Sequence, residues 1–169
     1  MNIYRKNTFL FLSIFTGLTA GLLLKLFAFD ILHISGSSME PSLHNKSMVA
    51  VNKLAFGLAK PFRADFFIQW NEPELNDVVT YLHNNKIVVK RCAGVGGDQL
   101  EFSQNSGYSV TINQKEIALN PVQYNLMKDY TCVPEGYIFA LGDNQKDSID
   151  SRDYGFVSIQ NITGKVIGK

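Results

Sequence analysis

Ser38 lies between a glycine and a proline, where its hydroxyl could serve as a nucleophile. The stretch SGSSMEPSL at 35–43 follows directly on a long apolar run. Gly36 lets the backbone bend tightly before Ser38, and Pro41 stiffens the chain after it. Such a turn could aim the Ser38 hydroxyl and its backbone N–H at one point, as an oxyanion site requires. A serine in an ordinary surface turn fits the same residues.

A serine nucleophile needs a proton acceptor, and the scattered histidines offer no obvious one: His33, His44 and His83. A lysine is the recognised alternative if burial lowers its pKa and keeps it neutral. In KIVVKRCAGV at 86–95, strand alternation places Val88, Lys90 and Cys92 on one face. Lys90 is the candidate base if that face is buried, although many strand lysines simply reach solvent.

The elements that would position these residues are short strands. Residues 83–85 and 113–115 are expected to connect hairpins, and residues 55–75 to form an irregular excursion. We expect no long helix after the apolar run, and therefore an all-β domain of about 140 residues. Alternating or β-branched residues predict six strands, at 48–54, 77–82, 86–95, 108–112, 116–119 and 136–142.

The apolar run TFLFLSIFTGLTAGLLLKLFAF at 8–29 predicts a transmembrane helix. As a helix it would span about 33 Å, enough for a hydrocarbon core of about 30 Å. Arg5 and Lys6 precede the run, which favours a cytoplasmic N-terminus. A cleaved signal peptide begins in a similar way, but no small-x-small site follows here. We therefore expect a cytoplasmic N-terminus at 1–7, an anchor at 8–29 and an extracytoplasmic domain at 30–169.

Composition and spacing exclude several other classes of function. The net charge of +1 gives no field that would select nucleic acid. GVGGDQ at 94–99 lacks the third glycine of a dinucleotide fingerprint, and residues 143–154 lack the glycine and glutamate of an EF-hand loop. Cys92 and Cys132 match no zinc spacing, and whether they form a disulfide stays open.

Four segments together resemble the catalytic-domain boxes of type I signal peptidases. They occur in the family's order behind a segment that would serve as its anchor. The last two segments in combination are highly specific, whereas the serine motif alone is weak. The segments are SSMEPSL at 37–43, NDVVTY at 76–81, VVKRCAGVGGD at 88–98 and LGDNQKDSIDSRDYGFV at 141–157.

The resemblance implies a membrane-bound serine endopeptidase that cleaves signal peptides from exported preproteins after small residues. It implies no metal and no organic cofactor. The implied fold is a mostly antiparallel β domain of coiled-sheet, open-barrel type, and the implied location is the bacterial cytoplasmic membrane. Exported preproteins and the lipid bilayer are then the expected partners, and nucleic acid is not.

The resemblance also implies a role for individual residues. Ser38 would be the nucleophile and Lys90 the general base. Gly36 stands where some members have a serine that assists the oxyanion. The last box would supply supporting residues: Ser148, which orients the lysine, the structural pair Asp150 and Arg152, and Asp143.

The pocket for the substrate residue before the cut would be lined by four apolar residues: Ile34, Met39, Leu43 and Val88. Such a pocket admits small side chains and rejects larger ones. Two other functions remain open at this stage. One is a dedicated maturation peptidase for a conjugation pilin or a single exported substrate, and the other is an inactive anchored domain that binds peptides.

Overall fold

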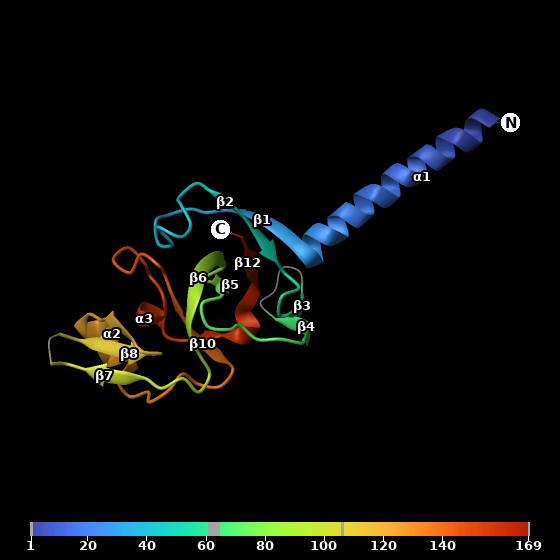
Figure 1. Cartoon of the computed structure of the whole chain (residues 1–169). Helices are drawn as coiled ribbons and strands as arrows, with labels where there is room; N and C mark the ends of the chain where they lie inside the picture. Colours follow the sequence, from blue (N-terminus) through green and yellow to red (C-terminus); the bar gives the residue numbers. More distant parts are fainter. Residues whose placement is uncertain (1, 61–64, 106, 169) are drawn as a thin grey trace.

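The chain forms one apolar helix that projects from a β domain (Figure 1). A computed structural model describes residues 2–60, 65–105 and 107–168, with side chains from residue 7 onward. The Arg5–Lys6 side chains and Pro61 lie outside this described part. Helix α1 (Asn2–Leu23) continues through a π-helical segment (Leu24–Ala28), and the part Asn7–Ala28 is long and apolar enough to cross a membrane, with a mean hydropathy of 1.9.

The helix is built for apolar surroundings. Residues 7–25 are exposed along the whole helix, and burial begins only at its end, where Ala28 packs into the protein. The hydroxyls of Ser13, Thr16 and Thr19 each donate to the carbonyl four residues earlier, so these polar groups are satisfied within the helix. The helical segment ends at Ala28, and Phe29, which we expected inside the anchor, begins strand β1.

A large antiparallel sheet forms the body of the domain and does not close on itself. Strands β1 and β11 are its two edges. The fold class predicted from the sequence, a mostly β domain with an open antiparallel sheet behind one N-terminal apolar helix, is confirmed. The order of strands is β1 (Phe29–His33), β2 (Met48–Asn52), β12 (Ile162–Ile167), β5 (Val78–His83), β6 (Lys86–Val95), β10 (Tyr137–Leu141) and β11 (Val157–Ser158).

The turns at two hairpins follow from residues that tolerate a positive φ. Asn84 and Asn85 join β5 to β6 with φ of 50° and 59°. Asn113 and Gln114 join β8 to β9 with φ of 49° and 64°. Two consecutive residues of this kind make the turn whose twist matches that of paired strands. Both turns lie within the segments where the sequence predicts hairpin connections.

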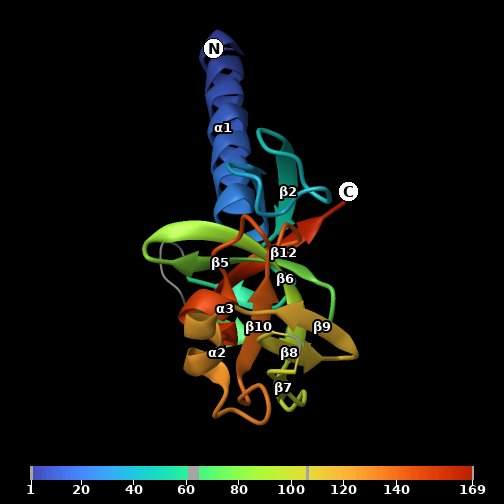
Figure 2. The ribbon, with the colours of Figure 1, turned by 90° about the vertical axis from the view of Figure 1, so that its left-hand side faces the viewer.

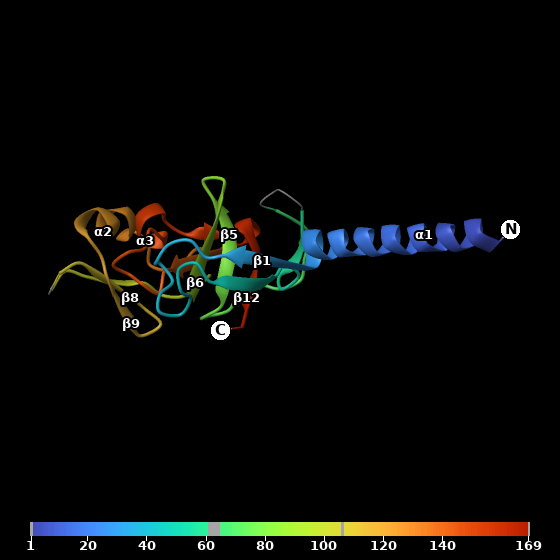
Figure 3. The ribbon, with the colours of Figure 1, turned by 90° about the horizontal axis from the view of Figure 1, so that it is seen from above.

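Two smaller sheets flank the large one. Strands β7 (Glu101–Ser103), β8 (Ser109–Ile112) and β9 (Lys115–Ala118) lie with helix α2 (Pro121–Met127) at the end remote from α1 (Figures 2 and 3). Strands β3 (Gly57–Ala59) and β4 (Phe66–Gln69) form a hairpin near the end of α1 (Figure 1). The prediction of an irregular excursion over 55–75 is therefore wrong for these strands.

The core consists of three apolar clusters. One contains Val79, Tyr81 and Cys92 under β5 and β6, and a second lies beneath the small sheet β7–β8–β9. The third packs the segment after β1 onto β2.

Both cysteines are free, so the disulfide left open by the sequence is not formed. Burial raises the pKa of the Cys92 thiol to about 12 and keeps it protonated.

Candidate active site

Ser38 and Lys90 meet although 52 residues separate them in the sequence. Ser38 lies in the turn after β1, and Lys90 lies in the middle of β6. The Lys90 Nζ donates a hydrogen bond to the Ser38 Oγ at 2.8 Å. With the amine neutral, the same contact can carry a proton from the hydroxyl to the nitrogen.

The apolar face of β6 keeps Lys90 away from water. Its neighbours on that face, Val88 and Cys92, pack into the cluster with Val79 and Tyr81, and Lys90 is only 4% exposed. Burial lowers the pKa of the Lys90 amine, because desolvation disfavours the charged form. The negative charge of Asp150 opposes this shift without reversing it.

A second loop holds the serine turn in place. The backbone N–H of Asn144 donates to the Ser38 carbonyl at 3.0 Å, and its side-chain Nδ2 donates to the Ser37 carbonyl at 3.2 Å. The Ser37 hydroxyl donates to the carboxylate of Asp147. Sequence reasoning missed all three of these residues, although they lie inside the quoted boxes. Their only signal was polar side chains beside the predicted nucleophile and within the 141–157 segment.

The turn itself leaves one donor available. Among the described residues, the Ser38 N–H donates to no other group. Gly36 has a φ of 101°, in the region that favours glycine, and its own N–H donates to Asn45 Oδ1 at 3.1 Å. Gly36 therefore shapes the turn, while its N–H is already used.

A buried ion pair braces the loop that follows β10. Arg152 Nε lies 2.8 Å from Asp150 Oδ1, with both side chains almost fully buried. The other carboxylate oxygen of Asp150 accepts from the Gly142 N–H at 3.0 Å, and Arg152 donates to the Gln145 carbonyl at 2.9 Å. Asp150 also caps helix α3 (Ser151–Tyr154). Together these contacts fix the two ends of the loop against each other.

Arg91, on the opposite face of β6 from Lys90, anchors the start of the same loop. Its guanidinium donates to Asp143 through two nitrogens, at 2.8 and 2.7 Å, and to the Asn76 carbonyl at 2.9 Å. Burial opposes ionisation of Asp143, but the bonds from Arg91 hold the pKa of its carboxyl below the ordinary value. Arg91 lies within the quoted segment VVKRCAGVGGD, but the sequence analysis gave it no role.

Ser148 lies beside the serine turn without a hydrogen bond to Lys90. Its hydroxyl oxygen is buried and has no partner among the described residues. A Cβ placed on Gly142 would lie 2.2 Å from Ser148 Oγ and 2.6 Å from the Ser38 carbonyl oxygen. Only glycine therefore lets these two segments approach so closely. A buried hydroxyl without a partner is rare enough to require an explanation.

A cleft of about 500 Å³ opens in front of Ser38 and Lys90. Of the predicted pocket residues, Ile34, Met39 and Val88 line it. Leu43 does not, and instead packs with Ile34 and Met39 in the third apolar cluster. The cleft is also lined by residues that sequence reasoning did not name: Leu32, Ile87, Asp147 and Ile149.

Two strand edges face this cleft. Strand β1 is an edge of the large sheet. Strand β6 pairs with β5 through residues 86–91 and with β10 through residues 91–95. Residues 86–90 therefore have no second strand partner in the described part of the chain. An extended peptide could add its own backbone hydrogen bonds at such edges.

No group of three or more His, Cys, Asp or Glu side chains in the described residues is arranged to hold a metal ion. The chemistry offered by the geometry is instead that of a hydroxyl nucleophile beside a buried amine.

Comparison with known proteins places the chain in a family. The sequence model "Signal peptidase, peptidase S26" matches residues 6–168. Signal peptidase I of Bacillus caldolyticus is 32% identical over 85% of this chain and 80% of its own length. Probable signal peptidase I-1 of Synechocystis is 32% identical over 89% of this chain and 75% of its own length.

A crystal structure of a signal peptidase I from Enterococcus faecalis is similar over 57% of this chain and 98% of that chain. Its identity of 24% and TM-score of 0.42 are low, and the assignment rests on the sequence matches alone. The protein is thus an enzyme of the serine endopeptidase class. The chain belongs to the signal peptidase family, peptidase S26.

Proposed function

We propose that the protein is a membrane-anchored endopeptidase that cleaves signal peptides from exported preproteins after small residues, with Ser38 as nucleophile and Lys90 as general base. Family membership supports signal-peptide cleavage by a serine protease. The observation that carries the assignment of residues is the 2.8 Å contact between Lys90 Nζ and Ser38 Oγ, made by an amine that is 4% exposed.

The proposed reaction has two halves, in which Ser38 is first acylated by the substrate and then released by water. Neutral Lys90 takes the proton of the Ser38 hydroxyl as Oγ attacks the scissile carbonyl carbon. Lys90 then returns that proton to the leaving amine as the C–N bond breaks. A water that gives its proton to Lys90 attacks the ester, and Ser38 is regenerated when the proton returns to its oxygen. No step requires a cofactor.

Two groups near Ser38 would stabilise charge during this reaction. The free N–H of Ser38 is available to the oxyanion of the tetrahedral intermediate. The unpaired Ser148 hydroxyl is available to accept a hydrogen bond from Lys90 once the amine carries its proton. The ion pairs Asp150–Arg152 and Asp143–Arg91 would act by holding the loop that carries Ser148.

Substrate recognition would follow from the two strand edges at the cleft. A preprotein segment extended between β1 and residues 86–90 would place alternate side chains toward the protein. Ile34, Met39 and Val88 would then surround the residue before the cut, with Leu43 supporting them from below. A pocket of these groups favours alanine, glycine or serine through steric exclusion of larger side chains.

The helix Asn7–Ala28 would anchor the enzyme in the bacterial cytoplasmic membrane. The proposed topology puts residues 1–7 in the cytoplasm, the anchor over about 8–29, and residues 30–169 outside. Digestion of sealed vesicles with an added protease tests this topology. A domain that is digested only in vesicles whose cytoplasmic face is outward would contradict it.

Cleavage of a preprotein by the purified full chain in detergent tests the function. Ser38→Ala and Lys90→Ala are each expected to abolish cleavage. Lys128→Ala, which removes an exposed lysine that does not line the cleft, is the control and is expected to retain activity.

Three outcomes bear on the proposal. Cleavage by Ser38→Ala or Lys90→Ala at the parent rate would refute the assigned roles. Activity on one preprotein and not on others of similar sequence would indicate a dedicated maturation peptidase. A parent chain that is inert on all of them would favour an inactive peptide-binding domain.

A further inference from the structure

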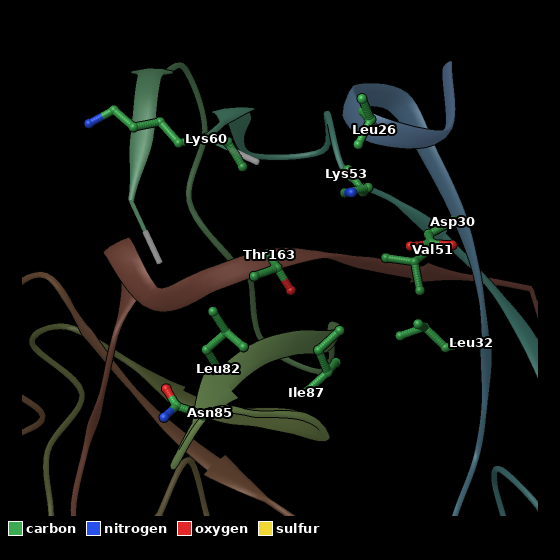
Figure 4. A pocket seen from close by; sticks show the side chains of 11 residues that line it. Leu26, Asp30, Leu32, Val51, Lys53, Lys60, Leu82, Asn85, Ile87 and Thr163 are labelled. Atoms are coloured by element: carbon green, nitrogen blue, oxygen red, sulfur yellow. The ribbon is translucent and has the colours of Figure 1, made fainter. Parts of the chain in front are cut away.

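A second cavity lies between the active-site cleft and the end of the helix that would form the anchor. It has a volume of about 520 Å³, within the range of ligand-binding pockets. Figure 4 shows side chains from several elements around it. We call it the anchor-side pocket, and its apolar wall is formed by Leu26, Leu32, Val51, Ala59, Leu82 and Ile87.

The anchor-side pocket adjoins the active-site cleft. Leu32 of β1 and Ile87 of β6 line both cavities. Along β1 the inward face runs from Ile34 in the cleft, through Leu32, to Asp30 in the anchor-side pocket. Leu26, in the last turn of the membrane-length helix, lines the opposite end. The two adjoining cavities therefore lie in series between the end of the helix and Ser38.

We infer that the anchor-side pocket binds apolar side chains of the substrate about five to seven residues before the cut. The inference rests on the proposed function. If the residue before the cut lies near Ile34, strand periodicity puts about the third residue before the cut near Leu32 and about the fifth near Asp30. In a signal peptide an apolar segment precedes the small-residue cleavage site, so the chain that enters the cleft brings apolar side chains from the anchor side.

The charges around the pocket favour an apolar peptide over an anionic lipid headgroup. The Lys60 ammonium pairs with Asp65, and in Figure 4 it points away from the apolar side chains. The Lys53 ammonium donates to the Lys25 carbonyl at 3.4 Å. Asp30 adds a negative charge at the pocket. Lys60 is therefore paired with a carboxylate, and a phosphate that approached Lys53 would also approach the carboxylate of Asp30.

The test changes both the substrate and the pocket. One preprotein is made with Leu, Asp or Lys at the fifth and sixth positions before the cut, and a short peptide begins three residues before the same cut. For the parent enzyme, Asp or Lys in place of Leu is expected to lower kcat/KM about tenfold. In the Leu82→Asp enzyme, kcat/KM for the Leu preprotein is expected to fall about tenfold relative to kcat/KM for the short peptide. In the same enzyme, kcat/KM for the Lys preprotein is expected to rise several-fold above its value in the parent. Leu82→Asn separates the introduced charge from the loss of packing.

A second measurement follows the bound substrate directly. A photo-crosslinker at the fifth position before the cut, presented to Ser38→Ala in detergent, is expected to label the fragments that contain Leu32 or Leu82. Labelling confined to other parts of the chain would overturn the inference.

The outcomes separate this inference from the proposed function. If the parent cleaves the short peptide but substrate and enzyme substitutions show no coupling, the pocket does not bind the substrate. If the parent cleaves neither, both proposals fail. If Leu82→Asp lowers cleavage of the short peptide only when phosphatidylglycerol vesicles are added, the pocket holds lipid, and the inference is wrong.

Discussion

Replacement of Lys90 by methionine tests whether the buried amine is neutral in the folded protein. Lys90 is 4% exposed, and burial lowers its pKa. In the unfolded chain the same amine is solvated, with an ordinary pKa of about 10.4. Between the two pKa values the unfolded state binds one proton more than the folded state. The free energy of unfolding of the parent therefore rises with pH in that window.

One proton sets the size of this effect. The contribution of Lys90 changes by at most about 1.4 kcal/mol per pH unit inside the window. Below the folded-state pKa both states bind the proton, and the contribution is constant and most destabilising. Lys90→Met lacks the amine, and the loss of its bond to Ser38 costs about 1 kcal/mol at every pH. The stability of the variant relative to the parent should therefore fall as pH rises.

Chemical unfolding of the full chain in detergent, from about pH 6 to about pH 10, measures this difference. Other titrating groups are common to both proteins and cancel to first order. Lys86→Met, at an exposed position of the same strand, serves as the matched control. If the curves of the parent and Lys90→Met run parallel, or diverge in the opposite sense, the amine does not change protonation as argued, and its role as a base is refuted.

Three further predictions concern activity and the frame of the site. On the acid side, kcat/KM should fall about tenfold per pH unit below the pKa of Lys90, because only the neutral amine accepts the proton; a flat acid limb with a quenched peptide substrate would contradict this. Gly142→Ala should destabilise the fold by about 1–3 kcal/mol and lower kcat, since its Cβ would lie 2.2 Å from Ser148 Oγ. Arg91→Lys should lower the free energy of unfolding by about 1–3 kcal/mol, because lysine cannot reproduce the two bonds to Asp143. An unchanged denaturation midpoint would contradict this prediction.

Alternation of apolar and polar residues and runs of β-branched residues predicted six of the strands. All six expected strands are present within a few residues of their predicted bounds, among them β6 with its apolar face at Val88 and Cys92. Strand β12 was missed, although it lies between β2 and β5 in the sheet. Its sequence ITGKVI has a glycine in the middle and no clean alternation. Its place depends on pairing with strands about 80 to 115 residues earlier, which no local window contains.

The start of helix α2 is marked in the sequence by a capping box. Asn120 precedes Pro121, and Gln123 lies three residues after the cap. The structure shows both bonds of a capping box at these residues. A proline at the first helical position after an asparagine cap is a recognised start of a helix. The helix has seven residues and no long apolar repeat, so it falls outside the expectation that no long helix follows the apolar run.

The site could be outlined from motifs, but its frame could not. The boxes named Ser38, Lys90 and the last-loop residues, and the structure brings the first two to 2.8 Å. The contacts of Arg91 with Asp143 and of Asn144 with the serine turn join segments about 50 and 106 residues apart. Such contacts depend on the register of the completed sheet. The anchor-side pocket has the same origin, because its wall comes from β1, β2, β3, β5, β6 and the end of the helix.

Two of the residues that break the rules of a stable core belong to the proposed site. An amine buried at Lys90 and a buried, unpaired hydroxyl at Ser148 both cost free energy. The nearby ion pair Asp150–Arg152 makes further hydrogen bonds to the backbone, which offset the cost of burying its charges while it holds the loop. Substitutions that replace Lys90 by an apolar residue should therefore stabilise the fold near neutral pH while they remove activity. Well-satisfied ion pairs around a buried amine and an unpaired hydroxyl are what a catalytic site would be expected to show, and they support the proposed roles of Ser38 and Lys90.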